Sequence, residues 1–90
     1  MSLPTDKSLV LEKQFRFQWE AAQDSYVLLY PEGLIRLPGS SGEIMKRIDG
    51  KVTAEDIVRE LEEAYPGVDL KQDVIDFLEV AHDKGWIRTD

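Results

Sequence analysis

The chain has 90 residues, a formal net charge of −7 and no cysteine, so we expect one small domain that is held by apolar packing, without disulfides or thiolate zinc sites. The acids are concentrated late: residues 1–42 carry a net charge of −1, and residues 43–90 carry −6. This charge repels phosphate backbones and anionic membranes, and no apolar run suits a membrane span or a secretory signal. We therefore expect a cytoplasmic protein that binds neither nucleic acid nor membrane.

Residues 1–14 form an N-terminal arm before the domain proper, which we place at residues 15–90. The arm is mixed in character and contains a short apolar patch at Leu9–Leu11. It is either a frayed tail or a segment that docks on its own domain or on a second copy. A homodimer through this arm, or through the strand that follows it, is one of the possibilities.

Three strands are predicted next. Residues 15–19 alternate aromatic and polar side chains, which is typical of a half-buried strand. Residues 26–30 and 34–37 are rich in strand-forming residues, and the Pro-Glu-Gly turn between them indicates a hairpin whose glycine suits a G1 bulge. Pro38 ends the last strand, so the pattern predicts a three-stranded antiparallel meander.

The second half of the chain has a helical period. The spacing of Ser40 and Glu43 predicts a capping box at the start of a short helix that stops at Gly50. Thr53 and Asp56 predict the start of a second helix, which the following Pro-Gly pair terminates.

A third helix is expected from Asp69 to the glycine at position 85, with its apolar side chains on one face. The apolar pair Trp86–Ile87 follows it and is expected to pack back on the domain. The fold class is therefore α+β: a three-stranded antiparallel sheet followed by three helices, in a layout that is similar to a winged helix-turn-helix.

No catalytic or metal-binding constellation is visible. The single histidine, His82, lies beside acids that are typical of a solvated helix face. The glycine-rich segment 39–42 is followed by Glu43, where a phosphate-binding loop would have lysine. We expect no enzymatic activity, no cofactor and no metal.

The winged-helix layout raises nucleic-acid binding as an alternative function. Residues 69–84 contain five acids and two bases, a net charge of −3 on the helix that would enter a groove. This charge disfavours DNA recognition. It also suggests that basic residues of a peptide or enzyme partner face this helix. A general protein-interaction adaptor is the other alternative.

The strand at residues 34–37 is the candidate for an interaction. It carries one charge and no proline, so its free edge can accept another strand through backbone hydrogen bonds. Beside the third helix it would form a groove that suits an extended peptide. Alternatively, the edge is covered by Trp86–Ile87 or by the N-terminal arm.

Several segments together resemble the PqqD family over about residues 15–88, and LLYPEG at residues 28–33 is the most specific of them. The others are Phe17–Glu20, Glu43–Ile44, Asp49–Gly50, Asp73–Val74, Phe77–Leu78 and Gly85–Trp86. The resemblance implies a peptide chaperone of pyrroloquinoline quinone biosynthesis. Such a chaperone binds the ribosomal precursor peptide PqqA and presents it to the radical S-adenosylmethionine enzyme PqqE, which crosslinks a glutamate to a tyrosine.

The resemblance also implies where the peptide lies. It would add as a strand beside residues 34–37 and contact the third helix. The residues implied for the backbone ladder are Leu34, Ile35, Arg36 and Leu37. The residues implied for side-chain contacts are Asp73, Val74, Asp76, Phe77 and Val80. For Val74 and Phe77, a plain core position is the competing interpretation.

Overall fold

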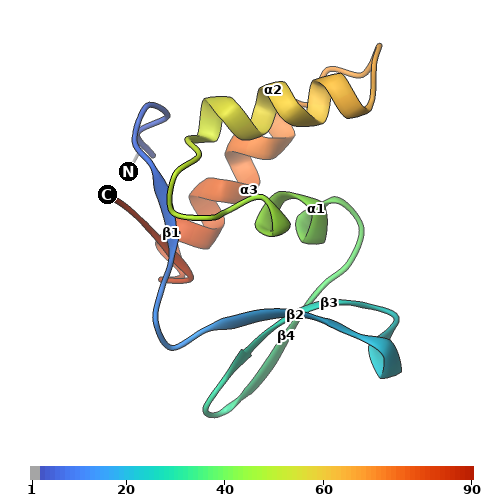
Figure 1. The fold of residues 1–90 in the computed structure, drawn as a ribbon, viewed down its shortest axis with the longest axis vertical. Helices are drawn as coiled ribbons and strands as arrows, with labels where there is room; N and C mark the ends of the chain where they lie inside the picture. Colours follow the sequence, from blue (N-terminus) through green and yellow to red (C-terminus); the bar gives the residue numbers. More distant parts are fainter. Residues whose placement is uncertain (1–2) are drawn as a thin grey trace.

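The computed structural model describes residues 3–90. Three helices lie on one side of a three-stranded sheet, and a short two-stranded ladder beside the helices joins the two ends of the chain (Figure 1). No helix of the described chain is long and apolar enough to cross a membrane. The elements in chain order are β1 (Leu9–Leu11), β2 (Arg16–Glu20), the 3-10 turn η1 (Ala21–Gln23), β3 (Ser25–Tyr30), β4 (Gly33–Leu37), α1 (Ser40–Lys46), α2 (Ala54–Ala64), α3 (Lys71–Asp83) and β5 (Ile87–Thr89).

The predicted meander is confirmed as the antiparallel sheet β2-β3-β4. The hairpin between β3 and β4 is tighter than expected, because Gly33 pairs directly with Tyr30 and the turn holds only Pro31 and Glu32. The G1 bulge prediction is therefore wrong. The difference matters because one extra residue in the turn would have shifted every partner along β4.

The two faces of this sheet differ in what they contact. Side chains alternate between faces along each strand, and the row Phe17, Leu28 and Ile35 lies on the face that packs into the core. The opposite, outer face carries Arg16, Leu29 and Leu34 in one row, Gln18, Val27 and Arg36 in the next, and Glu20 and Ser25 in the last.

The N-terminal arm docks on its own domain. Leu9–Leu11 pairs with Ile87–Thr89 as an antiparallel ladder, and Leu3 and Leu9 are buried. Arg88 also donates to the carboxylate of Glu12 at 3.1 Å. The frayed-tail interpretation is wrong for residues 3–11, because burying this apolar patch removes it from water. Residues 1–2 of the predicted arm lie outside the described residues.

Helix α2 begins as predicted. The Thr53 hydroxyl accepts from the Asp56 amide at 3.1 Å, and the Asp56 carboxylate accepts from the Thr53 amide at 3.0 Å. The hydrogen bond from the Thr53 amide, together with one from the Arg59 guanidinium, lowers the pKa of the Asp56 carboxyl. The capping box is confirmed.

The other two helix starts differ from the prediction. Helix α1 begins at Ser40 itself, after Gly39 with φ 59°, and has no side-chain cap. Helix α3 begins at Lys71, after Leu70, also without a side-chain cap. Its predicted end is confirmed, because Gly85 takes a φ of 77° that suits glycine.

One apolar core joins the helices, the ladder β1-β5 and the inner face of the sheet. Ile87 is buried in it, so the predicted packing of Trp86–Ile87 against the domain is confirmed. The buried members are Leu3, Leu9, Leu28, Leu37, Ile44, Met45, Ala54, Ile57, Val58, Leu61, Val74, Leu78, Ala81 and Ile87.

Candidate functional site

The outer edge of β4 pairs with no strand within residues 3–90. In a two-residue hairpin the closing pair, here Tyr30 and Gly33, exchanges both backbone hydrogen bonds, and hydrogen-bonded pairs then alternate along the ladder. The amide of Ile35 therefore points at β3. The amides of Leu34 and Arg36 point outward, where a further strand can accept from them.

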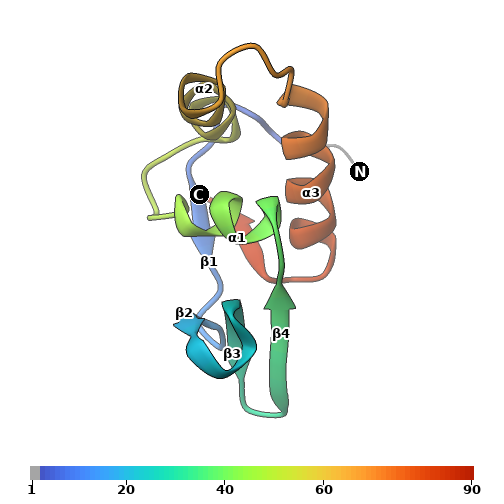
Figure 2. The same ribbon diagram turned by 90° about the vertical axis from the view of Figure 1, so that its right-hand side faces the viewer.

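Neither candidate cover pairs with this edge. Ile87 pairs with Leu11 in the β1-β5 ladder, and the carbonyl of Trp86 accepts from the Glu12 amide at 2.9 Å. The two segments that were alternatives for covering β4 thus bind each other instead. Figure 2 shows β4 with no strand beyond it, on the same side of the molecule as α3.

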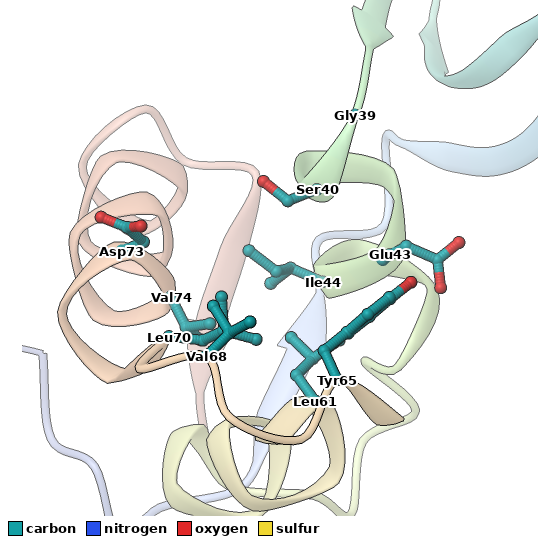
Figure 3. Close-up of a pocket in the computed structure, with 10 residues that line it drawn as sticks. All are labelled: Gly39, Ser40, Glu43, Ile44, Leu61, Tyr65, Val68, Leu70, Asp73 and Val74. Carbon is teal, nitrogen blue, oxygen red and sulfur yellow. The ribbon is translucent and has the colours of Figure 1, made fainter. Parts of the chain in front are cut away.

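An apolar cavity of about 380 Å³ begins where β4 ends. Gly39 and Ser40, which follow β4 after Pro38, form one wall of it. Figure 3 shows apolar side chains from all three helices and the loop before α3 converging below these two residues. The apolar lining residues are Ile44, Leu61, Tyr65, Val68, Leu70 and Val74.

Two side chains of this lining are unusually exposed for their type. Val68 is 52% exposed and Tyr65 is 49% exposed, whereas Ile44, Leu61 and Val74 beneath them are buried. The cavity therefore has a well-packed floor and an apolar rim that is open to solvent. Such a rim is suited to an apolar side chain of a ligand.

Only acids carry charge in the lining. Glu43 binds Arg47 at 3.2 Å, so its charge is partly compensated. Asp73 is exposed and has no ion-pair partner within residues 3–90. The cavity therefore favours a ligand that carries positive charge next to its apolar part.

The structure brings some of the predicted helix residues to this cavity and leaves others outside it. Asp73 and Val74 line it, with Val74 buried in its floor. Asp76 and Val80 lie farther along the exposed face of α3, and Asp76 accepts from Gln72 at 2.7 Å. Phe77 is half-buried and packs near Trp86, with ring centroids 6.4 Å apart.

Val74 and Phe77 on α3 had two competing interpretations, as core residues and as residues that contact a peptide. Val74 and Phe77 both pack in or against the core cluster, and Val74 additionally lines the cavity. Tyr65 and Val68 were not predicted as site residues. The available signal was their apolar character on either side of Pro66–Gly67, where a turn normally carries polar residues.

Within the described part of the chain, no three histidine, cysteine, aspartate or glutamate side chains gather as a metal-binding group. The exposed strand edge and the apolar cavity that follows it can together hold an extended ligand. Fold and site together define a small winged helix-turn-helix-like α+β recognition domain.

Comparison with known proteins makes the family definite. The family model "Coenzyme PQQ synthesis protein D (PqqD)" matches residues 25–87. A "PqqA binding protein" of Pseudomonas paraeruginosa is 51% identical over 89 residues, which cover 97% of each chain. One of Acinetobacter baylyi is 49% identical over 79 residues, which cover 87% of this chain and 80% of the relative. The chain belongs to the PqqD family.

Solved structures support the fold. The solution structure of the PqqD part of Methylobacterium extorquens PqqCD, described as a stand-alone RiPP recognition element, matches with a TM-score of 0.78 at 20% identity, over 97% of this chain and 95% of that one. The crystal structure of PqqD from Xanthomonas campestris matches with a TM-score of 0.57 at 26% identity, over 97% and 99%. The predicted family and fold class are confirmed.

Proposed function

We propose that this chain binds the precursor peptide PqqA as an added strand along β4 and presents it to PqqE, without catalysing a reaction itself. The observation that carries the proposal is the free edge of β4, which leads directly to an apolar cavity. The names of the relatives support the identity of the peptide.

In this proposal the backbone and the side chains of the peptide are held by different parts of the site. The outward amides of Leu34 and Arg36 donate to peptide carbonyls, and the carbonyls of the same residues accept peptide amides. A peptide strand that continues past Leu37 reaches Gly39 and Ser40, and there it inserts an apolar side chain between Val68 and Val74. This gives sequence preference to a contact that is otherwise made by backbone alone.

The acidic face of α3 adds an electrostatic contribution. Asp73 and Asp76 are exposed on it, and a basic residue of the peptide that lies over them is attracted without being buried. Exposed charge pairs add little to affinity but raise the association rate and fix orientation. Binding is then expected to weaken moderately, and not to vanish, as salt is raised.

The benefit to the modification reaction is entropic. A disordered peptide loses conformational freedom when its reactive residues are positioned on an enzyme. A chaperone that has already ordered one part of the peptide lowers this cost for the enzyme.

The test is calorimetry of the full chain with the PqqA peptide encoded in the same genome. A scrambled peptide of identical composition is the control. We expect saturable heat with PqqA and none with the scrambled peptide. The absence of heat and of spectral change at tens of micromolar PqqA, or equal binding of both peptides, would overturn the proposal.

A further inference from the structure

The outer face of the β2-β3-β4 sheet carries arginines that lack carboxylate partners. The chain has five arginines, and Arg47, Arg59 and Arg88 each lie within 4 Å of a carboxylate oxygen. Arg16 and Arg36, both on the outer face, have no such partner within residues 3–90. The same face carries one acid, Glu20, which lies opposite Ser25 and accepts from the Ala22 amide at 3.4 Å. Arg16 and Arg36 are therefore free to meet carboxylates of a partner.

An apolar strip separates these two arginines. Arg16 lies in one row with Leu29 and Leu34, and Arg36 lies two residues beyond Leu34 on β4. From the ordinary spacings of strands and residues, the Cα atoms of the two arginines are about 12 Å apart. Leu34 is 41% exposed, although it is a leucine. The face thus offers an apolar contact between two cations.

A shallow hollow of about 260 Å³ adjoins the β2 end of this strip. Its lining includes Arg16 and Leu29 from the outer face, and its only charged residues are Lys13 and Arg16. Lys13 likewise forms no ion pair within residues 3–90. Two unpaired cations beside a hollow without acids are suited to a carboxylate group.

We propose that the basic face, defined as Lys13, Arg16, Leu29, Leu34 and Arg36, docks an acidic protein surface whose carboxylates surround an apolar contact. Because the hollow continues into an apolar strip, the occupant is a protein surface and not a free anion. The occupant is the enzyme that receives the peptide, so this inference rests on the proposed function.

The position of the basic face on the sheet determines what a docked enzyme contacts. A peptide strand added at β4 extends the same sheet, so its outward side chains continue the basic face. An enzyme that docks there contacts the carrier and the bound peptide on one continuous surface. Enzyme docking uses outward side chains of the sheet, whereas the peptide uses the backbone edge of β4, so the two binding events do not compete.

The experiment measures binding of the full chain to immobilised PqqE by surface plasmon resonance at roughly 50 mM salt. The test variant is Lys13→Glu/Arg16→Glu, on residues that hold no part of the peptide site. The matched control is Lys7→Glu/Lys51→Glu, which makes the same change in net charge at two exposed lysines away from the sheet. Thermal melting checks that both variants fold, and Lys13→Gln/Arg16→Gln provides a second, milder test.

We expect the control to bind like the wild type and Lys13→Glu/Arg16→Glu to bind about tenfold more weakly or worse, chiefly through a slower association rate. The glutamine variant is expected to fall between them. Equal binding of test and control variants would overturn the inference. The inference would also be overturned if PqqE failed to bind the wild-type chain, or if light scattering showed that the variant changes self-association alone.

Parallel calorimetry with PqqA separates this inference from the proposed function. We expect Lys13→Glu/Arg16→Glu to retain peptide affinity, because neither residue lies on the β4 edge. If no variant binds PqqA while PqqE capture still depends on Lys13 and Arg16, the proposed function fails and the docking face stands. Loss of peptide and enzyme binding together would overturn the inference.

Discussion

Replacing Arg36 with proline tests the strand-addition geometry at a single backbone group. The amide of Arg36 points away from β3, because Arg36 and Val27 form a pair without hydrogen bonds in the hairpin. Proline removes this donor without breaking any bond between β3 and β4, and edge strands tolerate proline at such positions. Arg36→Ala removes the side chain but keeps the amide, so the difference between the two variants isolates the donor.

The expected loss of peptide affinity is the contribution of one hydrogen bond. The edge offers two outward amides, those of Leu34 and Arg36, and a net hydrogen bond contributes about 0.5–1.5 kcal/mol. Arg36→Pro should therefore bind PqqA about 2- to 13-fold more weakly than Arg36→Ala in calorimetry. Ile35→Pro is a contrasting variant, since its amide bonds to Leu28 within the hairpin and its loss should destabilise the fold. If folded Arg36→Pro and Arg36→Ala bind PqqA equally, the strand-addition reasoning is refuted.

Three further changes test the cavity, the packing and the capping box. Val68→Asp on the cavity rim should weaken PqqA binding about tenfold by removing an apolar contact. Ala22→Asp in the exposed η1 turn is the control and should leave binding unchanged. Equal effects of the two variants in calorimetry would exclude the cavity from the site. Gly42→Ala should destabilise the fold by about 1–2 kcal/mol in urea unfolding, because the added Cβ would lie 2.9 Å from the Tyr26 ring and 3.0 Å from the Leu37 carbonyl oxygen. This crowding outweighs the gain in helix propensity. Ser40→Ala on the same helix is the control, and an unchanged unfolding midpoint for Gly42→Ala would contradict this packing. Hydrogen bonds lower the pKa of Asp56 below its ordinary value of 3.8, so its contribution to folding stability is present above that value and is lost as pH falls through the lowered pKa. On acidification from pH about 6 to about 2, the free energy of unfolding of the wild type should therefore fall more than that of Asp56→Asn. An equal fall in both proteins would contradict the role of the cap.

The local signals in the sequence were sufficient for the elements but not for their ends. Alternation at residues 15–19 and the Thr53–Asp56 spacing each depend on neighbours within a few residues, and both predictions were confirmed. Ser40 had the same spacing to Glu43, but its role as a cap required an extended backbone at Ser40. Gly39 takes the cap position instead, with a φ of 59°, and the helix already includes Ser40.

Features that join distant parts of the chain were not predictable from local pattern. The three-residue strand Leu9–Leu11 pairs with Ile87–Thr89 at the other end of the chain, and strands this short have little signal of their own. The cavity arises where α1, α2 and α3 converge, so its rim at Tyr65 and Val68 was missed while Asp73 and Val74 were included. Residues 34–37 were proposed as a ladder, but the outward amides follow only from the observed two-residue turn.

Amide exchange measured by nuclear magnetic resonance, with and without saturating PqqA, tests the central claim most directly. The sheet has two free edges, and by the same alternation the outward amides on β2 are those of Phe17 and Trp19. Peptide addition along β4 predicts that the amides of Leu34 and Arg36 become protected from exchange while those of Phe17 and Trp19 do not. Unchanged exchange at Leu34 and Arg36, or protection of the β2 edge instead, would contradict the account.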